Sequence, residues 1–199
     1  MIINESLLLS HGAECIEYEV NEIIFHEGTT PKFYYQIVEG IVELKNYHDE
    51  GKEFTHNILS SGQCFGESLL LNERSYPMTA VAQTPCKILK LSKIIFLDLL
   101  QQNPQVALNM FKCLADRLYY KYIMLFNISS NNPSQQLKTL MDYYRDYNFN
   151  GVEKSNKVPF TRKQLANLTG LRIETVIRTV KKMEKDRILK IENGKIYYS

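Results

Sequence analysis

The chain has 199 residues, of which 44% are hydrophobic and 23% charged, as expected for an ordinary globular protein of one or two domains. No apolar run approaches the roughly 20 residues that a membrane-spanning helix requires, and the N-terminus lacks the positively charged start of a secretory signal, so a cytoplasmic location and no membrane partner are expected. The net charge of +2 divides into −5 for residues 1–130 and +7 for residues 131–199, which suggests a polyanionic partner for the C-terminal third; a merely solvated basic face is the alternative, and charge alone does not decide between them.

Residues 14–92 are expected to form short strands separated by turns. Val, Ile, Phe and Tyr dominate the candidate strands, and glycine-containing turn signals lie at residues 26–28, 39–40, 49–51 and 60–62. The predicted strands are Ile23–His26, Phe33–Glu39, Ile41–Asn46, Phe54–Leu59 and Lys87–Leu91. Strands at this even spacing predict an antiparallel sandwich or barrel.

A long helix is predicted from Pro104 to about Ser129, after a shorter helix that Ser92 caps and that extends through Gln102. At 1.5 Å per residue the long helix would measure roughly 37 Å. Aromatic residues give it apolar surface on more than one side: Tyr119, Tyr120, Tyr122 and Phe126. Such a helix requires two partners, so we expect its own domain on one side and a second subunit on the other; a core helix in a monomer is the alternative.

The polar break at residues 129–133 is the expected domain boundary. We predict a first domain at residues 1–103, a dimerisation helix at 104–130 and a basic C-terminal domain at 131–199. The last of these is expected to contain a helix over Ser134–Tyr147, a polar loop over Phe149–Lys157, two short helices and a hairpin. Asn193-Gly194 at the hairpin turn is a strong signal for a type I′ turn.

Residues 161–185 have the pattern of a helix-turn-helix. Thr161 and Gln164 are spaced as a capping box, Ala166 is small where two helices cross, and Gly170 can adopt the left-handed turn that ends the first helix. The predicted apolar seam between the two helices consists of Leu165, Leu171, Val176 and Val180. A helical hairpin without any role in DNA binding is the alternative.

The second helix of this motif presents residues suited to the major groove. Arg178 could pair bidentately with guanine and Glu174 could accept from cytosine, while nearby basic residues contact phosphates. The predicted DNA-contacting residues are Arg162, Arg172, Ile173, Glu174, Thr175, Arg178, Lys181 and Lys182. Strands at Ile188–Ile191 and Lys195–Tyr198 would add a wing.

The cysteines and histidines do not predict a metal site or a catalytic centre. The four cysteines are far apart, and the four histidines include no H-x-H or H-E-x-x-H pattern. A metal-dependent enzyme of the cupin type, the alternative for a strand-rich domain, would require several converging histidines and carboxylates. No catalytic residue and no metal are therefore expected.

The chain as a whole resembles the Crp/Fnr family of regulators, and the resemblance covers nearly all of its length. Segments 24–28, 33–40, 50–53 and 61–67 are typical of the cyclic-nucleotide-binding fold, and the string Leu165-Ala166…Gly170-Leu171…Glu174-Thr175-Val176…Arg178 is typical of the family's DNA-binding motif. The resemblance implies an α+β protein with an N-terminal antiparallel β-roll, a long dimerisation helix and a C-terminal winged helix-turn-helix. It further implies a homodimer on pseudo-palindromic double-stranded DNA, a ligand in the β-roll, and RNA polymerase as a partner.

The chain departs from the family's cyclic-AMP pattern at both ends of the ligand pocket. Glu67 matches the ribose-binding acid, but the phosphate-binding arginine falls on Tyr76 and the hydroxyl pair of the long helix falls on Lys121-Tyr122. We therefore expect another, unidentified small-molecule effector or none; the alternative is a cyclic-nucleotide response through a shifted contact at Arg74. The residues assigned to the effector pocket are Glu67, Arg74, Tyr76, Lys121 and Tyr122. In the reading helix, Ile173 replaces an arginine that is common in the family.

Overall fold

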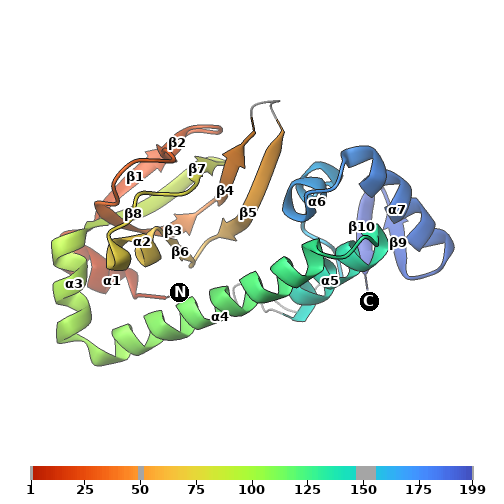
Figure 1. Ribbon diagram of the computed structural model, residues 1–199. Coiled ribbons are helices and arrows are strands. Elements are labelled where there is room, and N and C mark those ends of the chain that lie inside the picture. The colour runs from red at the N-terminus through yellow and green to blue at the C-terminus, as the bar shows by residue number, and fades with distance from the viewer. Residues whose placement is uncertain (1, 49–51, 147–155, 199) are drawn as a thin grey trace. The chain divides into compact units, whose positions relative to one another are not determined.

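The computed structural model describes residues 2–48, 52–146 and 156–198, and the chain divides into two compact units, Met1–Asp116 and Arg117–Ser199 (Figure 1). The turn predicted at residues 49–51 and most of the loop predicted at Phe149–Lys157 lie outside the described residues. The three-part division of the chain predicted above stays a prediction.

The N-terminal unit contains two four-stranded antiparallel sheets. One sheet has the order β1-β8-β3-β6 and the other the order β2-β7-β4-β5. The strands are β1 (Glu14–Tyr18), β2 (Ile23–Phe25), β3 (Phe33–Glu39), β4 (Ile41–Tyr47), β5 (Glu53–Ser60), β6 (Cys64–Phe65), β7 (Thr79–Ala82) and β8 (Cys86–Ser92). The five predicted strands are confirmed as β2, β3, β4, β5 and β8, and the antiparallel β-roll is confirmed with them.

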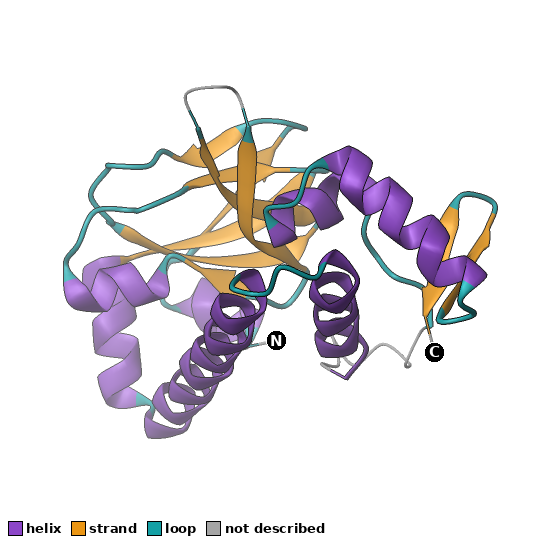
Figure 2. Cartoon of the chain, turned by 45° about the vertical axis from the view of Figure 1, so that its right-hand side comes forward, coloured by secondary structure: helices purple, strands orange, loops and turns teal. Residues whose placement is uncertain are grey.

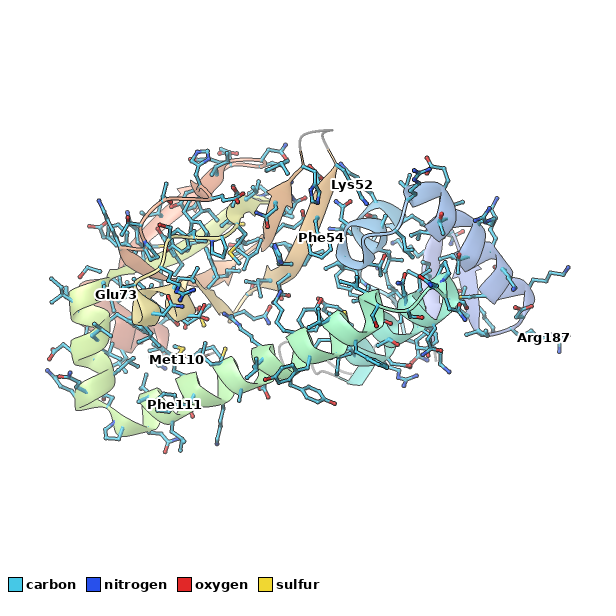
Figure 3. All side chains as sticks on the ribbon, in the orientation of Figure 1. Lys52, Phe54, Glu73, Met110, Phe111 and Arg187 are labelled. Carbon is cyan, nitrogen blue, oxygen red and sulfur yellow. The ribbon has the colours of Figure 1, made fainter. Side chains whose placement is uncertain are left out.

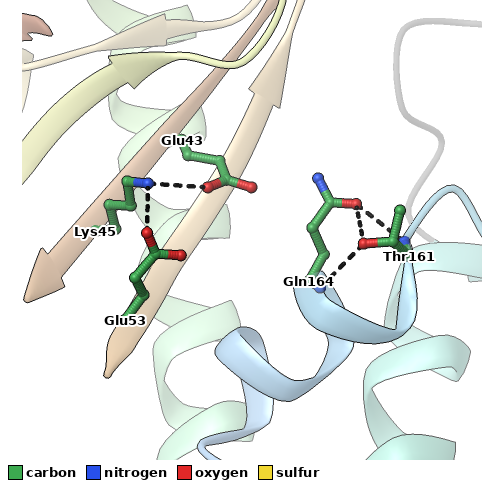
Figure 4. Close-up of polar contacts among 5 residues, drawn as sticks. All are labelled: Glu43, Lys45, Glu53, Thr161 and Gln164. Atoms are coloured by element: carbon green, nitrogen blue, oxygen red, sulfur yellow. Dashed lines mark hydrogen bonds and ion pairs between the residues drawn. The ribbon is translucent and has the colours of Figure 1, made fainter. Parts of the chain in front are cut away.

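The core of the roll lies between the two sheets. Successive side chains of a strand point to opposite faces of its sheet, so every second residue can enter the core. Val42 and Leu44 of β4 do so. The buried residues of this core are Phe25, Tyr35, Ile37, Val42, Leu44, Leu59, Phe65, Tyr76, Ala80, Ala82, Cys86 and Ile88. On β4 and β5, Lys45 Nζ lies 3.2 Å from Glu53 Oε1 and 3.9 Å from Glu43 Oε2, so charged side chains also join these strands (Figure 4).

A second core joins the β1-β8-β3-β6 sheet to the helices α1 (Glu5–Ser10), α2 (Glu67–Asn72), α3 (Lys93–Gln102) and the first half of α4 (Pro104–Ile128). Ser92 caps α3 as predicted, accepting from the backbone N–H of Ile95. Met110 and Phe111 are neighbours on α4 (Figure 3), but Met110 is buried in this core whereas Phe111 is 64% exposed. One face of α4 therefore packs on the roll while another is left open.

The C-terminal unit contains α5 (Pro133–Asp146), α6 (Arg162–Thr169), α7 (Ile173–Lys185) and a hairpin of β9 (Leu189–Glu192) and β10 (Lys195–Tyr198), which lies beside α7 (Figure 2). At the corner between α4 and α5, Asn127 Nδ2 donates to Gln136 O at 2.9 Å and Gln136 Nε2 donates to Ser130 O at 2.6 Å. Ser130 lies in the break between the helices, where the Gln136 side chain supplies its carbonyl with a donor, and Asn127 links the end of α4 to the first turn of α5. The predicted helix, two short helices and hairpin are all confirmed.

Candidate nucleic-acid interface

The start of α6 is fixed by the predicted capping box. Gln164 N donates to Thr161 Oγ1 at 3.1 Å, and Thr161 N donates to Gln164 Oε1 at 3.0 Å (Figure 4). Both backbone donors would otherwise have no partner within the helix. At the other end of α6, Gly170 has a φ of 72°, so the left-handed turn predicted there is also confirmed.

The two faces of α7 differ in character. Val176, Thr179, Val180 and Met183 are buried and pack this helix into the domain. The opposite face is exposed, and its side chains are Ile173, Glu174, Ile177, Arg178, Lys181, Lys182 and Lys185. An open, basic helix face that begins directly after the turn is the arrangement that inserts into a major groove.

Three other residues expected at the interface occupy different positions. Arg172 is the exposed N-cap residue of α7, and its side chain makes no capping hydrogen bond. Thr175 is half-buried on the flank of α7. Arg162, expected to contact a phosphate, is half-buried and donates a hydrogen bond to the backbone oxygen of Gly194 at the hairpin turn.

The hairpin of β9 and β10, called the wing below, adds basic residues that sequence reasoning did not single out. Ile196 pairs with Ile191 and Tyr197 pairs with Lys190, so alternate residues of each strand point to opposite faces. Lys190 and Lys195 are exposed, whereas Ile196 is buried. The alternation of charge and hydrophobicity in the sequence could have identified these lysines.

The predicted effector pocket contains a buried tyrosine. The ring of Tyr76 stacks on Phe25 with centroids 3.7 Å apart and 8° between the planes, and Tyr35 stacks on Phe65 at 5.1 Å and 10°. Phe25 also lies 5.8 Å from Tyr35, so the four rings form one cluster between the sheets. Aromatic side chains thus fill this part of the roll.

Glu67 and Tyr76 lie near each other in the roll. Glu67 is fully buried at the start of α2, and burial raises the pKa of the Tyr76 hydroxyl, as do the neighbouring Tyr35 and Glu67. The Tyr76 hydroxyl is itself buried and has no hydrogen-bond partner among the described residues. A Cβ placed on Gly66 would lie 3.2 Å from this hydroxyl, so the tyrosine reaches to the backbone at the start of α2.

The other three residues assigned to the pocket are Arg74, Lys121 and Tyr122, and all three are exposed. Arg74 is exposed, and its backbone N–H donates to Asn72 Oδ1. Lys121 and Tyr122 are exposed on α4 within the C-terminal compact unit. A single pocket that includes all five residues stays a prediction.

The open face of α4 forms a continuous apolar stripe. Its members recur at alternating spacings of three and four residues, the heptad pattern of a coiled coil. This α4 stripe consists of Leu108, Phe111, Ala115, Leu118, Tyr122 and Leu125, and all six residues are exposed. Tyr122 therefore has a second interpretation, as a member of the stripe. Phe126, which is 82% exposed, lies next to it.

Two family models match the chain in consecutive segments. Residues 15–103 match the cyclic nucleotide-binding domain, and residues 137–198 match the Crp-like helix-turn-helix domain. The chain belongs to the Crp/Fnr family. The family and the fold class predicted from the sequence are thus confirmed, and this Crp/Fnr protein is a DNA-binding transcription regulator.

Known relatives of this Crp/Fnr protein are similar over most of their length. It is 26% identical to the cAMP-activated global transcriptional regulator CRP of Haemophilus influenzae, over 87% of this chain and 78% of that protein. The transcriptional activatory protein AadR of Rhodopseudomonas palustris is 23% identical, over 90% and 74% respectively. Among solved structures, the c-di-GMP-responsive regulator CLP of Xanthomonas campestris is similar in fold, with a TM-score of 0.77 at 18% identity, over 97% of this chain and 96% of that one.

The described residues contain neither a membrane-spanning helix nor a metal-binding cluster. No helix there is both long and apolar enough to cross a bilayer. Within the same residues, no group of three or more His, Cys, Asp and Glu side chains is placed to hold a metal ion.

Proposed function

We propose that this Crp/Fnr regulator acts as a homodimer that reads a pseudo-palindromic DNA site through α7, and that cyclic AMP does not activate it. The observation that carries the second half is the buried, stacked side chain of Tyr76 at the position of the family's phosphate-binding arginine. The first half is supported by the exposed face of α7 and by the α4 stripe.

Base recognition is assigned to Glu174 and Arg178, which are both exposed near the start of α7. Their spacing of four residues places them one above the other on the same face of the helix. Lys181 and Lys182 lie one turn further along and are assigned to phosphates, which position the protein without reading sequence. Ile173 gives this helix an apolar start, so its preferred DNA sequence should differ from that of the cyclic-AMP regulators.

Rejection of cyclic AMP follows from charge and volume together. A cyclic phosphate carries one negative charge and requires a cation or several donors when it leaves water. In the interior of the roll it would meet the aromatic ring of Tyr76 and the nearby carboxyl group of Glu67, and Arg74 lies exposed outside it. Relatives of this fold use different effectors, since one is cAMP-activated and another is c-di-GMP-responsive. Membership of the family therefore does not specify the effector.

The alternative, a cyclic-nucleotide response through Arg74, would require this loop to shift. Tyr76 N donates to Thr29 O at 2.9 Å, and Gly28 N donates to Tyr76 O at 2.8 Å. A shift that brings Arg74 inward by two residues would break both bonds and remove the aromatic ring from its stack. These contacts favour the arrangement with Tyr76 inside.

The assignment of a homodimer rests on the α4 stripe. Six apolar side chains exposed in one heptad register match the requirements of an identical helix from a second copy of the chain. An effect on RNA polymerase stays a prediction.

Calorimetric titration of the purified protein with cyclic AMP tests the effector half, and no saturable binding is expected up to millimolar nucleotide. The Arg74→Ala variant is the matched control, because the alternative requires it to lose binding that the wild type shows. Saturable micromolar binding by the wild type would overturn this half.

Selection of bound duplexes from a random pool tests the DNA half and should return a two-fold symmetric sequence. An unenriched pool at low salt would contradict it.

A further inference from the structure

The wing is a two-stranded element that requires support from the rest of its domain. A lone two-stranded hairpin is at best marginally stable in water. Leu189, Ile196 and Tyr198 are buried and anchor one face of the wing. At the turn, Asn193 and Gly194 have φ angles of 48° and 74°, as the predicted type I′ turn requires.

The helices α5, α6 and α7 each contribute one polar side chain to the wing. From α5, Asp142 Oδ1 accepts from the Tyr198 hydroxyl at 2.6 Å, and from α7, Glu184 Oε1 accepts from Ile191 N at 3.0 Å. From α6, Arg162 donates to Gly194 O. The three contacts lie at the base, the edge and the tip of the wing respectively.

The arginine at the tip differs in burial from the other basic residues expected to contact DNA. Arg172, Lys181 and Lys182 are exposed, whereas Arg162 is half-buried. Its backbone position is set by the capping box of Thr161 at the residue before it. The backbone of Arg162 is therefore held by the start of α6, and its guanidinium group is bonded to the wing turn.

We propose that Arg162 is a positioning residue, which holds the wing tip against α6 so that Lys195 meets the DNA backbone, and is not itself a phosphate contact. This proposal rests on the DNA-binding function. It assigns the phosphate contact to the exposed Lys195, directly after the turn. The contribution of Arg162 to affinity then passes through the wing.

A double-variant cycle on DNA binding separates the two roles. Arg162→Leu, Lys195→Ala and the double variant are compared by fluorescence anisotropy with a labelled duplex of mixed sequence. If Arg162 acts through the wing, the double variant should bind DNA no more weakly than the single variant with the larger loss of affinity. The second change would then remove a contact that the first has already lost. Two independent phosphate contacts would instead multiply the two fold-losses, which would overturn the proposal.

Arg162→Gln adds a test of charge. Glutamine keeps an N–H donor for Gly194 O but loses the positive charge, so it should retain more affinity than leucine and should leave the salt dependence close to that of the wild type. Each phosphate contact contributes about 0.9 to the slope of log affinity against log salt on B-DNA. A decrease of about 0.9 in that slope for Arg162→Gln would contradict the proposal.

The free protein supplies the third readout, on the full-length chain. Amide NMR signals of residues 193–195 should move and show lower order in Arg162→Leu without any DNA, and should stay unchanged in Lys182→Ala. Unaltered wing signals in Arg162→Leu would overturn the proposal. If the wild type bound no DNA, the proposed function would fail, while this arm would still decide whether Arg162 holds the wing. Circular dichroism of each variant shows whether it is folded.

Discussion

Tyr76 and Phe25 stack face to face in the interior of the β-roll, with 3.7 Å between ring centroids. The Tyr76 hydroxyl at the far end of this stack is buried without a hydrogen-bond partner among the described residues. The ring and the hydroxyl therefore make opposite contributions to stability. Removal of each part gives a separate prediction for the same position.

Tyr76→Ala should lower the free energy of unfolding by about 3–5 kcal/mol, because it leaves a cavity the size of an aromatic ring. Tyr76→Phe should leave it unchanged or raise it by about 1 kcal/mol, because it removes only an unsatisfied buried hydroxyl. Urea denaturation followed by circular dichroism measures both. A large loss in Tyr76→Phe would show that the hydroxyl has a partner in solution.

Thr161→Ala should destabilise the C-terminal unit by about 0.5–2 kcal/mol, because the backbone N–H of Gln164 loses its acceptor at the start of α6. Thr161→Ser keeps that acceptor and serves as the control. Hydrogen exchange of the first α6 amides, monitored by mass spectrometry, should become faster in the alanine variant alone. Equal protection in both variants would contradict a stabilising role for the cap.

Arg178→Ala should cost about 1–3 kcal/mol of binding free energy on the selected DNA sequence and should relax base preference at one position in each half-site. Lys182→Ala is the matched control on the same helix, and it should weaken binding to all sequences alike and decrease the salt slope by about 0.9. Anisotropy titrations on selected and mixed duplexes distinguish them. Equal losses on both duplexes for Arg178→Ala would argue against base recognition.

Leu118→Glu should convert the dimer into a monomer, because it places a charge in the middle of the α4 stripe. Asp116→Lys changes the charge of an exposed residue on the same helix outside the stripe, and should leave the dimer intact. Sedimentation velocity measures the oligomeric state directly. Dimers of unchanged affinity in Leu118→Glu would remove the stripe from the interface.

Alkaline pH should destabilise the protein through Tyr120. Burial raises the pKa of this tyrosine to about 12, from an ordinary value of 10.0. Its stabilising contribution, on the order of 2 kcal/mol, is therefore complete below pH 10 and is lost as the pH rises to about 12. In Tyr120→Phe, the decline in unfolding free energy between pH 10 and 12 should be shallower than in the wild type. Parallel pH profiles would contradict the assignment.

The elements that the sequence predicts well are those with local signals. The capping box at Thr161, the left-handed turn at Gly170 and the N-cap at Ser92 each depend on residues within a few positions of one another. The helix α2 has no such signal, since its N-cap is Gly66 and no side chain caps it. Its buried Glu67 and Leu70 are fixed by contacts with distant strands, so this short helix was not predicted.

The sequence predicts which residue types the candidate site contains, but it does not predict which partners their side chains contact. Charge and periodicity identified Arg178 and Lys182, whose side chains have only to be exposed. Charge also assigned Arg162 to a phosphate, but in the fold it donates to a backbone carbonyl 32 residues away. Periodicity gave α4 two apolar sides without showing that Met110 faces the core and Phe111 does not, because that depends on where the sheet lies.

The helix α4 is continuous from Pro104 to Ile128, yet the boundary between the two compact units falls inside it, after Asp116. The first half of the α4 stripe thus belongs to one unit and the second half to the other. One residue inserted at the boundary would rotate the halves by about 100° against each other and split the stripe, whereas seven would restore its phase and add about 10 Å. Insertions or deletions at this point therefore keep the stripe in phase only when they are about seven residues long, or a multiple of seven. Loops elsewhere in the molecule do not have this restriction.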